Sequence, residues 1–180
     1  MRIFRKIMLG GGIDIASLPE TSKLYYEATA KVYPKSGSLG YPIIKNSWDS
    51  TTGKGIIVCP KDISIIDELS FSSIYYLTSI TIPNSVTTIG SSAFSACSRL
   101  TSVTIGDSVT TIGDYTFQDC NSLTSVYCKA TTPPALGGNS VFIPNVSGRK
   151  IYVPMESVEA YKSATNWSEY ADSIVGYDFN

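Results

Sequence analysis

The sequence contains no histidine among its 180 residues. Histidine is the usual general base near neutral pH and the commonest metal ligand, so its absence excludes serine and cysteine triads that are built on it. Charge is also scarce, because charged residues make up 16% of the chain and the formal net charge is −1. This balance gives no electrostatic reason to expect nucleic acid or an anionic membrane as a partner.

Long apolar runs are lacking as well. No run approaches the roughly 20 residues that span a bilayer, so we predict no membrane span. The basic start MRIFRK leads into a short apolar stretch at 7–9, which three glycines and Asp14 interrupt. A secretory signal peptide needs about 7–15 apolar residues in its core, and we therefore expect no classical signal peptide.

The sequence instead contains a repeat of 23 residues. The segments LTSITIPNSVTTIGSSAFSACSR at 77–99 and LTSVTIGDSVTTIGDYTFQDCNS at 100–122 are identical at 13 of 23 positions. The same register extends backwards over 54–76 and forwards from Leu123 as columns of apolar residues. The columns include Ile57, Ile80, Val103 and Val126; Ile66, Ile89 and Ile112; Phe71, Phe94 and Phe117; and Ile74, Cys97 and Cys120. Such a period predicts stacked coils whose apolar side chains form ladders.

Each unit predicts a coil with three sides. The I-x-I pair is typical of a short strand with alternate side chains buried, and V-x-x-I indicates a second, shorter extended segment. The A-F-x-x-C tail indicates one turn of α or 3₁₀ helix that inserts the phenylalanine into the core. The fold class expected is therefore a mainly β repeat solenoid of about four coils.

The flanks of the repeat differ from it, and the chain divides into four predicted parts. Residues 1–20 have no periodicity and are expected to be flexible. Residues 21–53 form a β-rich N-terminal cap, with β-type runs at 24–29 and 31–33. The solenoid covers 54–148, and residues 149–180 form a C-terminal cap with a strand at 149–154 and a helix at 155–167. Terminal caps are required because an end coil exposes its apolar core.

The repeat LTSITIPNSVTTIGSSAFSAC resembles the BspA-like leucine-rich repeat, a bacterial type that its A-F-x-x-C tail separates from other leucine-rich repeats. The likeness is strongest over 54–128, and the segment at 125–179, from SVYCKATTPPAL to VGYDF, resembles the terminal region that commonly closes such arrays in gut anaerobes. It implies a right-handed solenoid that serves surface adhesion and protein binding, without enzymatic activity or a cofactor. The start MRIFRKIML resembles the opening of phage and prophage structural proteins.

These observations lead to three hypotheses about function. The first is an interaction or adhesion module on a phage or prophage virion, which binds a protein or glycan partner. The second is a purely structural component of a particle, in which residues 1–20 dock into a neighbouring virion protein. The third is an adhesin on the bacterial cell surface.

Strand alternation selects the candidate binding residues. The side chains expected on the outside of the main sheet are Ser79, Thr81, Ser102, Thr104, Ser125 and Tyr127, with Ile56 and Val58 continuing the stripe one rung earlier. An aligned Ser/Thr ladder can bond to itself and to water, or it can form a partner-binding face. Tyr127 has the chemistry of an interface anchor.

Cysteines and acidic residues are weaker candidates for a site. Cys97 and Cys120 occupy one column on adjacent coils, so a disulfide is sterically allowed, but a free thiol also suits a small buried position. Without histidine or a C-x-x-C pair, zinc is not expected. The acidic residues Asp107, Asp114 and Asp119 fall on different sides of one coil, so we predict solvated turn carboxylates rather than a calcium site.

Overall fold

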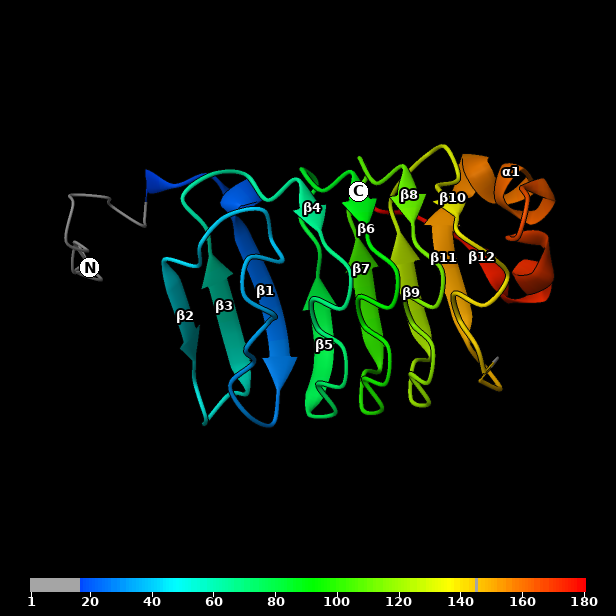
Figure 1. Ribbon diagram of the computed structural model, residues 1–180. Coiled ribbons are helices and arrows are strands. Elements are labelled where there is room, and N and C mark those ends of the chain that lie inside the picture. The colour runs from blue at the N-terminus through cyan, green and yellow to red at the C-terminus, as the bar shows by residue number, and fades with distance from the viewer. Residues whose placement is uncertain (1–16, 145) are drawn as a thin grey trace.

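The computed structural model describes residues 17–144 and 146–180, and strands dominate it (Figure 1). The larger sheet has the order β12 (Ile174–Tyr177), β11 (Lys150–Pro154), β9 (Ser125–Cys128), β7 (Ser102–Ile105), β5 (Leu77–Thr81), β1 (Lys23–Ala28), β3 (Lys54–Val58) and β2 (Lys45–Trp48). The smaller sheet has the order β10 (Ala135–Leu136), β8 (Thr111–Ile112), β6 (Thr88–Ile89) and β4 (Ile65–Ile66). The helical segments are short: η2 (Glu20–Ser22), η3 (Met155–Ser157), α1 (Val158–Ser163) and η4 (Ser168–Ser173).

The 23-residue register is confirmed where the repeat is strongest. Strands β5, β7 and β9 are parallel neighbours, and their pairing places Ile80, Val103 and Val126 in one line. The smaller sheet repeats the same step, because Ile89 pairs with Ile112 in parallel strands. Each unit thus contributes one strand to each sheet, an arrangement consistent with a repeat solenoid.

The core between the sheets contains the phenylalanine ladder. Ring centroids lie 5.1 Å apart for Phe71 and Phe94, 5.3 Å for Phe94 and Phe117, and 5.4 Å for Phe117 and Phe142. All four side chains are fully buried. The predicted column ended at Phe117, and Phe142 extends it into the segment where the sequence repeat is lost.

One predicted column is wrong at its first member. Ile57 of β3 does not neighbour Ile80 of β5, because β1 lies between the two strands and runs antiparallel to both. A Cβ atom at Gly55 would lie 2.1 Å from the ring of Tyr26, so β1 packs closely only because β3 has a glycine there. The repeat register predicts which coils are neighbours along the chain. It cannot predict that β1, which lies outside the repeat, is inserted between β3 and β5.

The predicted helical turn in A-F-x-x-C is also wrong. Ala93 and Cys97 donate backbone hydrogen bonds three residues back, to Gly90 and Phe94, whereas the N–H of Phe94 between them bonds to Thr116 of the next coil. The intervening Ala96 has a φ of 60°. Backbone donors therefore alternate between closing a turn and linking coils, which a helix cannot do because its N–H groups all bond along one axis.

The flanks fit the predictions in part. Strand β1 matches the run predicted at 24–29, but residues 31–33 form no strand and β2 at 45–48 was not predicted. Strand β11 matches the strand predicted at 149–154 and pairs in parallel with β9. The single predicted helix at 155–167 is replaced by η3 and α1, and the unpredicted β12 pairs with β11. Within the described residues, no helix has the length and hydropathy of a membrane span.

Candidate functional site

The six predicted binding residues lie together on one side of the larger sheet, which we call the outer face. Strand register aligns them in two rows. The first row contains Ser79, Ser102 and Ser125, and the second contains Thr81, Thr104 and Tyr127. All six side chains are partly or fully exposed, whereas the alternating residues Ile80, Val103 and Val126 are buried. The outer face is therefore a continuous hydroxyl-bearing surface over three parallel strands.

Both rows continue beyond the predicted residues. The first row runs through Lys54, Glu27, Ser79, Ser102, Ser125 and Lys150. The second row runs through Ile56, Tyr25, Thr81, Thr104, Tyr127 and Tyr152. The prediction for Ile56 and Val58 was wrong in two ways: Tyr25 separates Ile56 from Thr81, and Val58 is fully buried. The inserted β1 explains the first error.

Four aromatic side chains gather at one end of the second row, and we call them the aromatic cluster: Tyr127, Tyr152, Tyr177 and Phe179. Tyr127 and Tyr152 stack with centroids 4.6 Å apart and planes 12° apart, close to the strand spacing of about 4.8 Å. Tyr177 meets both rings edge-on at 5.4 and 5.5 Å, and Phe179 lies 4.9 Å from Tyr177. Three of these contacts, all made by Tyr177, use edge-to-face geometry, which the quadrupoles of aromatic rings favour.

The chain after β12 runs back over the outer face, as the red trace to the C-terminus in Figure 1 indicates. It borders an open, shallow hollow of about 360 Å³, which we call the C-terminal hollow. Its lining residues are Thr104, Tyr127, Lys129, Tyr177, Asp178, Phe179 and Asn180. Two of the six predicted residues, Thr104 and Tyr127, therefore line a concave site rather than a flat sheet.

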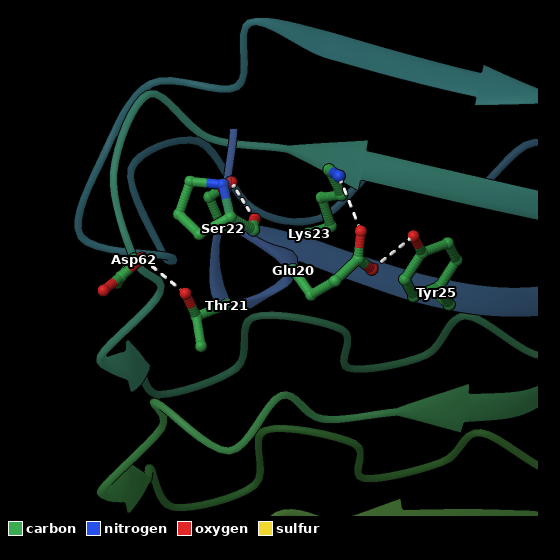
Figure 2. Close-up of polar contacts among 7 residues, drawn as sticks. Glu20, Thr21, Ser22, Lys23, Tyr25 and Asp62 are labelled. Carbon is green, nitrogen blue, oxygen red and sulfur yellow. Dashed lines mark hydrogen bonds and ion pairs between the residues drawn. The ribbon is translucent and has the colours of Figure 1, made fainter. Parts of the chain in front are cut away.

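The opposite end of the second row is held by the contacts in Figure 2. The Tyr25 hydroxyl donates to one oxygen of Glu20 at 2.7 Å, and Lys23 donates to the other at 2.7 Å. Burial raises the pKa of Tyr25 to about 12, and the bond to Glu20 adds to the effect. The hydrogen bond from Lys23, followed by that from Tyr25, lowers the pKa of the Glu20 carboxyl. Tyr25 is thus a fixed, protonated phenol that borders Thr81.

The cysteines provide packing rather than chemistry. All four are free and buried, which favours the packed-thiol alternative over a Cys97–Cys120 bridge. The Cys97 thiol donates to the Phe71 carbonyl at 3.1 Å, and the Cys120 thiol donates to the Phe94 carbonyl at 3.2 Å. Burial raises the pKa of both thiols, that of Cys120 to about 12. Neutral buried thiols are poor nucleophiles and poor metal ligands.

The acidic residues do not gather into a metal site. Over 17–144 and 146–180, no three His, Cys, Asp or Glu side chains are grouped so that they could hold a metal ion. Asp107 accepts a hydrogen bond from Asn84 of the preceding coil at 2.9 Å, and Asp114 accepts one from the backbone N–H of Tyr115. These contacts are those of turn carboxylates in a repeated corner.

Sequence reasoning missed Tyr25, Tyr152, Tyr177 and Phe179. A signal existed for Tyr152, because KIYV at 150–153 aligns with SVYC at 125–128 and places a second tyrosine in the same column. No comparable signal exists for Tyr25, whose strand lies outside the repeat. Tyr177 is the last residue of β12, a strand that was not predicted, and Phe179 is placed by the path of the chain after it.

Comparison with known proteins agrees with this arrangement. The family model described as BspA type Leucine rich repeat region (6 copies) matches residues 43–165, which is more than half of the chain. No curated protein matches the sequence. The match includes the repeats that pair in parallel, with their phenylalanine ladder and outward hydroxyl rows. The chain therefore belongs to the BspA type leucine rich repeat family.

Proposed function

We propose that the protein is a non-enzymatic interaction or adhesion module whose outer face binds a protein or glycan partner. Leucine-rich repeat domains are generally binding modules, and repeat arrays present extended surfaces for that purpose. The observation that carries the proposal is the second row, which places a stacked tyrosine pair beside exposed threonines. Tyrosine combines a large apolar area with a polar tip, which makes it a common interface anchor.

The finer architecture belongs to the same proposal. The array is a right-handed solenoid of about four coils at 54–148, and residues 21–53 and 149–180 close its ends. The protein is displayed on a phage or prophage virion, or alternatively on the bacterial cell surface. The support is the likeness of MRIFRKIML at 1–9 to virion structural proteins, and these nine residues lie outside the described part of the chain.

The binding role is tested by placing charge on the first row. The variant Ser102→Lys with Ser125→Glu introduces opposite charges on neighbouring strands, which avoids like-charge repulsion in the sheet. The matched control, Thr87→Lys with Thr110→Glu, changes two exposed neighbouring residues beside the smaller sheet. Binding of labelled protein to host or bacterial surface preparations should fall about tenfold or more for the first pair only.

Two results would contradict the proposal. One is equal binding by both variants, and the other is no binding to any surface preparation by the unaltered protein. Treating the surface with protease or periodate before the assay separates protein from glycan partners. The treatment that abolishes binding identifies the class of partner.

The structural alternative is a role in particle assembly through residues 1–20. The support is again the resemblance of MRIFRKIML to phage structural proteins. Deletion of residues 1–16 should release the protein from purified particles. Unchanged incorporation, measured by immunoblotting of particles, would rule this alternative out.

A further inference from the structure

We infer that the C-terminal hollow binds a sugar residue of a neutral saccharide. The inference rests on the proposed function, because it names the chemistry of a partner for the same outer face. It concerns the part of that face where the chain after β12 converts a flat sheet into a concave site.

The aromatic cluster offers one free ring face to the hollow. Tyr127 lies between Tyr152 and Thr104 in the second row, and its ring is nearly parallel to that of Tyr152. Its opposite face is therefore directed toward Thr104, whose short side chain leaves space above the sheet. A pyranose ring presents C–H groups on its broad side, and these groups pack against the negative face of an aromatic ring.

The polar lining matches the hydroxyl groups of a sugar, each of which donates and accepts. Lys129 is a donor, Asp178 is an acceptor, and Thr104 and Asn180 can act as both. Asp178 Oδ1 accepts bonds from the backbone N–H and the side-chain amide of Asn180, at 3.0 and 2.9 Å. In the part of the chain that the structure describes, no group donates to Asp178 Oδ2, which is therefore available as an acceptor.

Charge and size select a neutral saccharide over the alternatives. Among the described residues that line the hollow, Lys129 is the only cationic side chain, and the carboxylate of Asp178 opposes its charge. A polyanion would need a cluster of cationic groups. The volume of about 360 Å³ is near the lower limit for small-ligand pockets, which is about 300 Å³. A stable protein partner would need about 800 Å² on each side, which a hollow of this size does not supply.

Affinity electrophoresis of the whole chain tests the inference. Native gels contain soluble mannan, xyloglucan, dextran or the anionic polygalacturonate. We expect retardation by at least one neutral polysaccharide and none by polygalacturonate. Tyr127→Ala and Phe179→Ala should weaken the apparent affinity about tenfold or more, as expected for aromatic anchors. Tyr115→Ala is the control, because it removes a tyrosine that is 43% exposed and lies in a turn beyond β8 of the smaller sheet, outside the lining of the hollow.

A second variant guards against misfolding. Thr104→Arg fills the hollow without removing an aromatic residue, and it should also abolish retardation. The inference is overturned if no neutral polysaccharide retards the protein, if only polygalacturonate does, or if the hollow variants migrate like the control. The two inferences can fail separately, because Ser102 and Ser125 do not line the hollow. If the saccharide test fails but the variant Ser102→Lys with Ser125→Glu still loses binding to surface preparations, the proposed function is supported without a saccharide site in the hollow.

Discussion

Arg149 is the largest charged side chain in the core, and it is 2% exposed. Its Nε donates to the carbonyl of Leu123 at 2.8 Å, and its two terminal nitrogens donate to Phe142 and Pro144. Its guanidinium carbon also lies 5.7 Å from the centroid of the Phe142 ring. The side chain thus links the loop that contains Phe142 and Pro144 to Leu123 of the preceding coil, at the point where the 23-residue repeat is lost.

Replacing Arg149 with alanine should lower the free energy of unfolding by about 3 kcal/mol. The change leaves three carbonyl groups without their donor in a buried site, and each unsatisfied group is costly. Urea denaturation monitored by circular dichroism measures the loss. Lys150→Ala, at the exposed neighbouring position, should stay within about 0.5 kcal/mol. A similarly small effect for Arg149→Ala would show that water replaces the guanidinium.

The buried thiols should lower the free energy of unfolding at alkaline pH. Burial raises the pKa of Cys59 and Cys128 to about 11 and that of Cys120 to about 12. Thiols of the unfolded chain have a pKa of about 8.5, so above that pH the folded state retains protons that the unfolded state releases. The free energy of unfolding should therefore fall as pH rises above that value, by up to about 1.4 kcal/mol per pH unit for each thiol.

Urea unfolding between about pH 7 and pH 10 measures this decline. A variant with both Cys97→Ala and Cys120→Ala carries two fewer buried thiols and should show a shallower decline. The free energy of unfolding of this variant at neutral pH will differ from that of the unaltered protein. The comparison therefore uses only the slope of the free energy of unfolding against pH. Parallel curves for the two proteins would contradict the assignment.

At the scale of elements, the turns between the two sheets repeat an unusual backbone. Residues with positive φ recur every 23 positions, in the two series Leu69, Ser92 and Tyr115, and Ser73, Ala96 and Asp119. A positive φ is energetically unfavourable for a residue with a Cβ atom, and all six of these residues have one. The alternating backbone hydrogen bonds that they allow, within a coil and between coils, stabilise the conformation in every unit.

A second repeated feature is the glycine that follows each strand of the smaller sheet from β6 onward. Gly113 donates its N–H to Ile89 of the previous coil at 2.7 Å, and an added Cβ would lie 2.4 Å from the backbone nitrogen of Ser91. Gly90 and Gly137 are equally crowded, with distances of 2.5 and 2.4 Å. Neighbouring coils therefore approach at this corner only because no side chain separates them.

Gly113→Ala should destabilise the protein by about 3 kcal/mol, because the nearest atoms belong to backbone that cannot move aside without opening two coils. The shift in the urea midpoint measures the effect. Gly176→Ala in the edge strand β12 is the comparison, since its nearest contacts are at 3.3 Å and need to shift by only a few tenths of an ångström, so its loss of stability should be clearly smaller. Equal midpoints for the two variants would mean that the corner is not tightly packed.

The stacking of strands inside the repeat could be predicted from the sequence. Outside it, the runs that form β1 and β11 could be predicted, but the place of β1 between β3 and β5 could not. Val103 and Phe94 lie where the period places them, because stacking identical coils puts each residue beside its own copy. The helical prediction for A-F-x-x-C failed because positive φ at Ala96 has no signature in a sequence without glycine there. The outward rows were predicted from strand alternation, but the hollow was not, since it depends on a path after β12 that no local pattern encodes.

At the scale of the whole molecule, β1 joins two parts that the repeat alone would have stacked directly. It pairs with β3 through Leu24 and Ile57, and with β5 through Tyr26 and Ile80. The larger sheet therefore combines antiparallel pairs at one end with parallel pairs at the other, as the strand directions in Figure 1 illustrate. The outer face remains continuous across this junction, and Tyr25 contributes an aromatic side chain at the boundary.

The parallel part of the array should accept an additional coil. A second copy of residues 77–99 can be inserted after Arg99. It would place the copies of Ile80, Phe94 and Asn84 beside the original residues. The junction with residues 100–122 would stay unchanged. Repeat stability is approximately a sum of unit and neighbour terms, so 23 further residues should add roughly 1–3 kcal/mol to the free energy of unfolding.

The urea m-value should rise as well, because more surface is buried. An insertion of the same composition in scrambled order is the control and should destabilise the fold. If the ordered copy is no better tolerated than the scrambled one, the stacking of identical coils does not by itself account for the stability of the array.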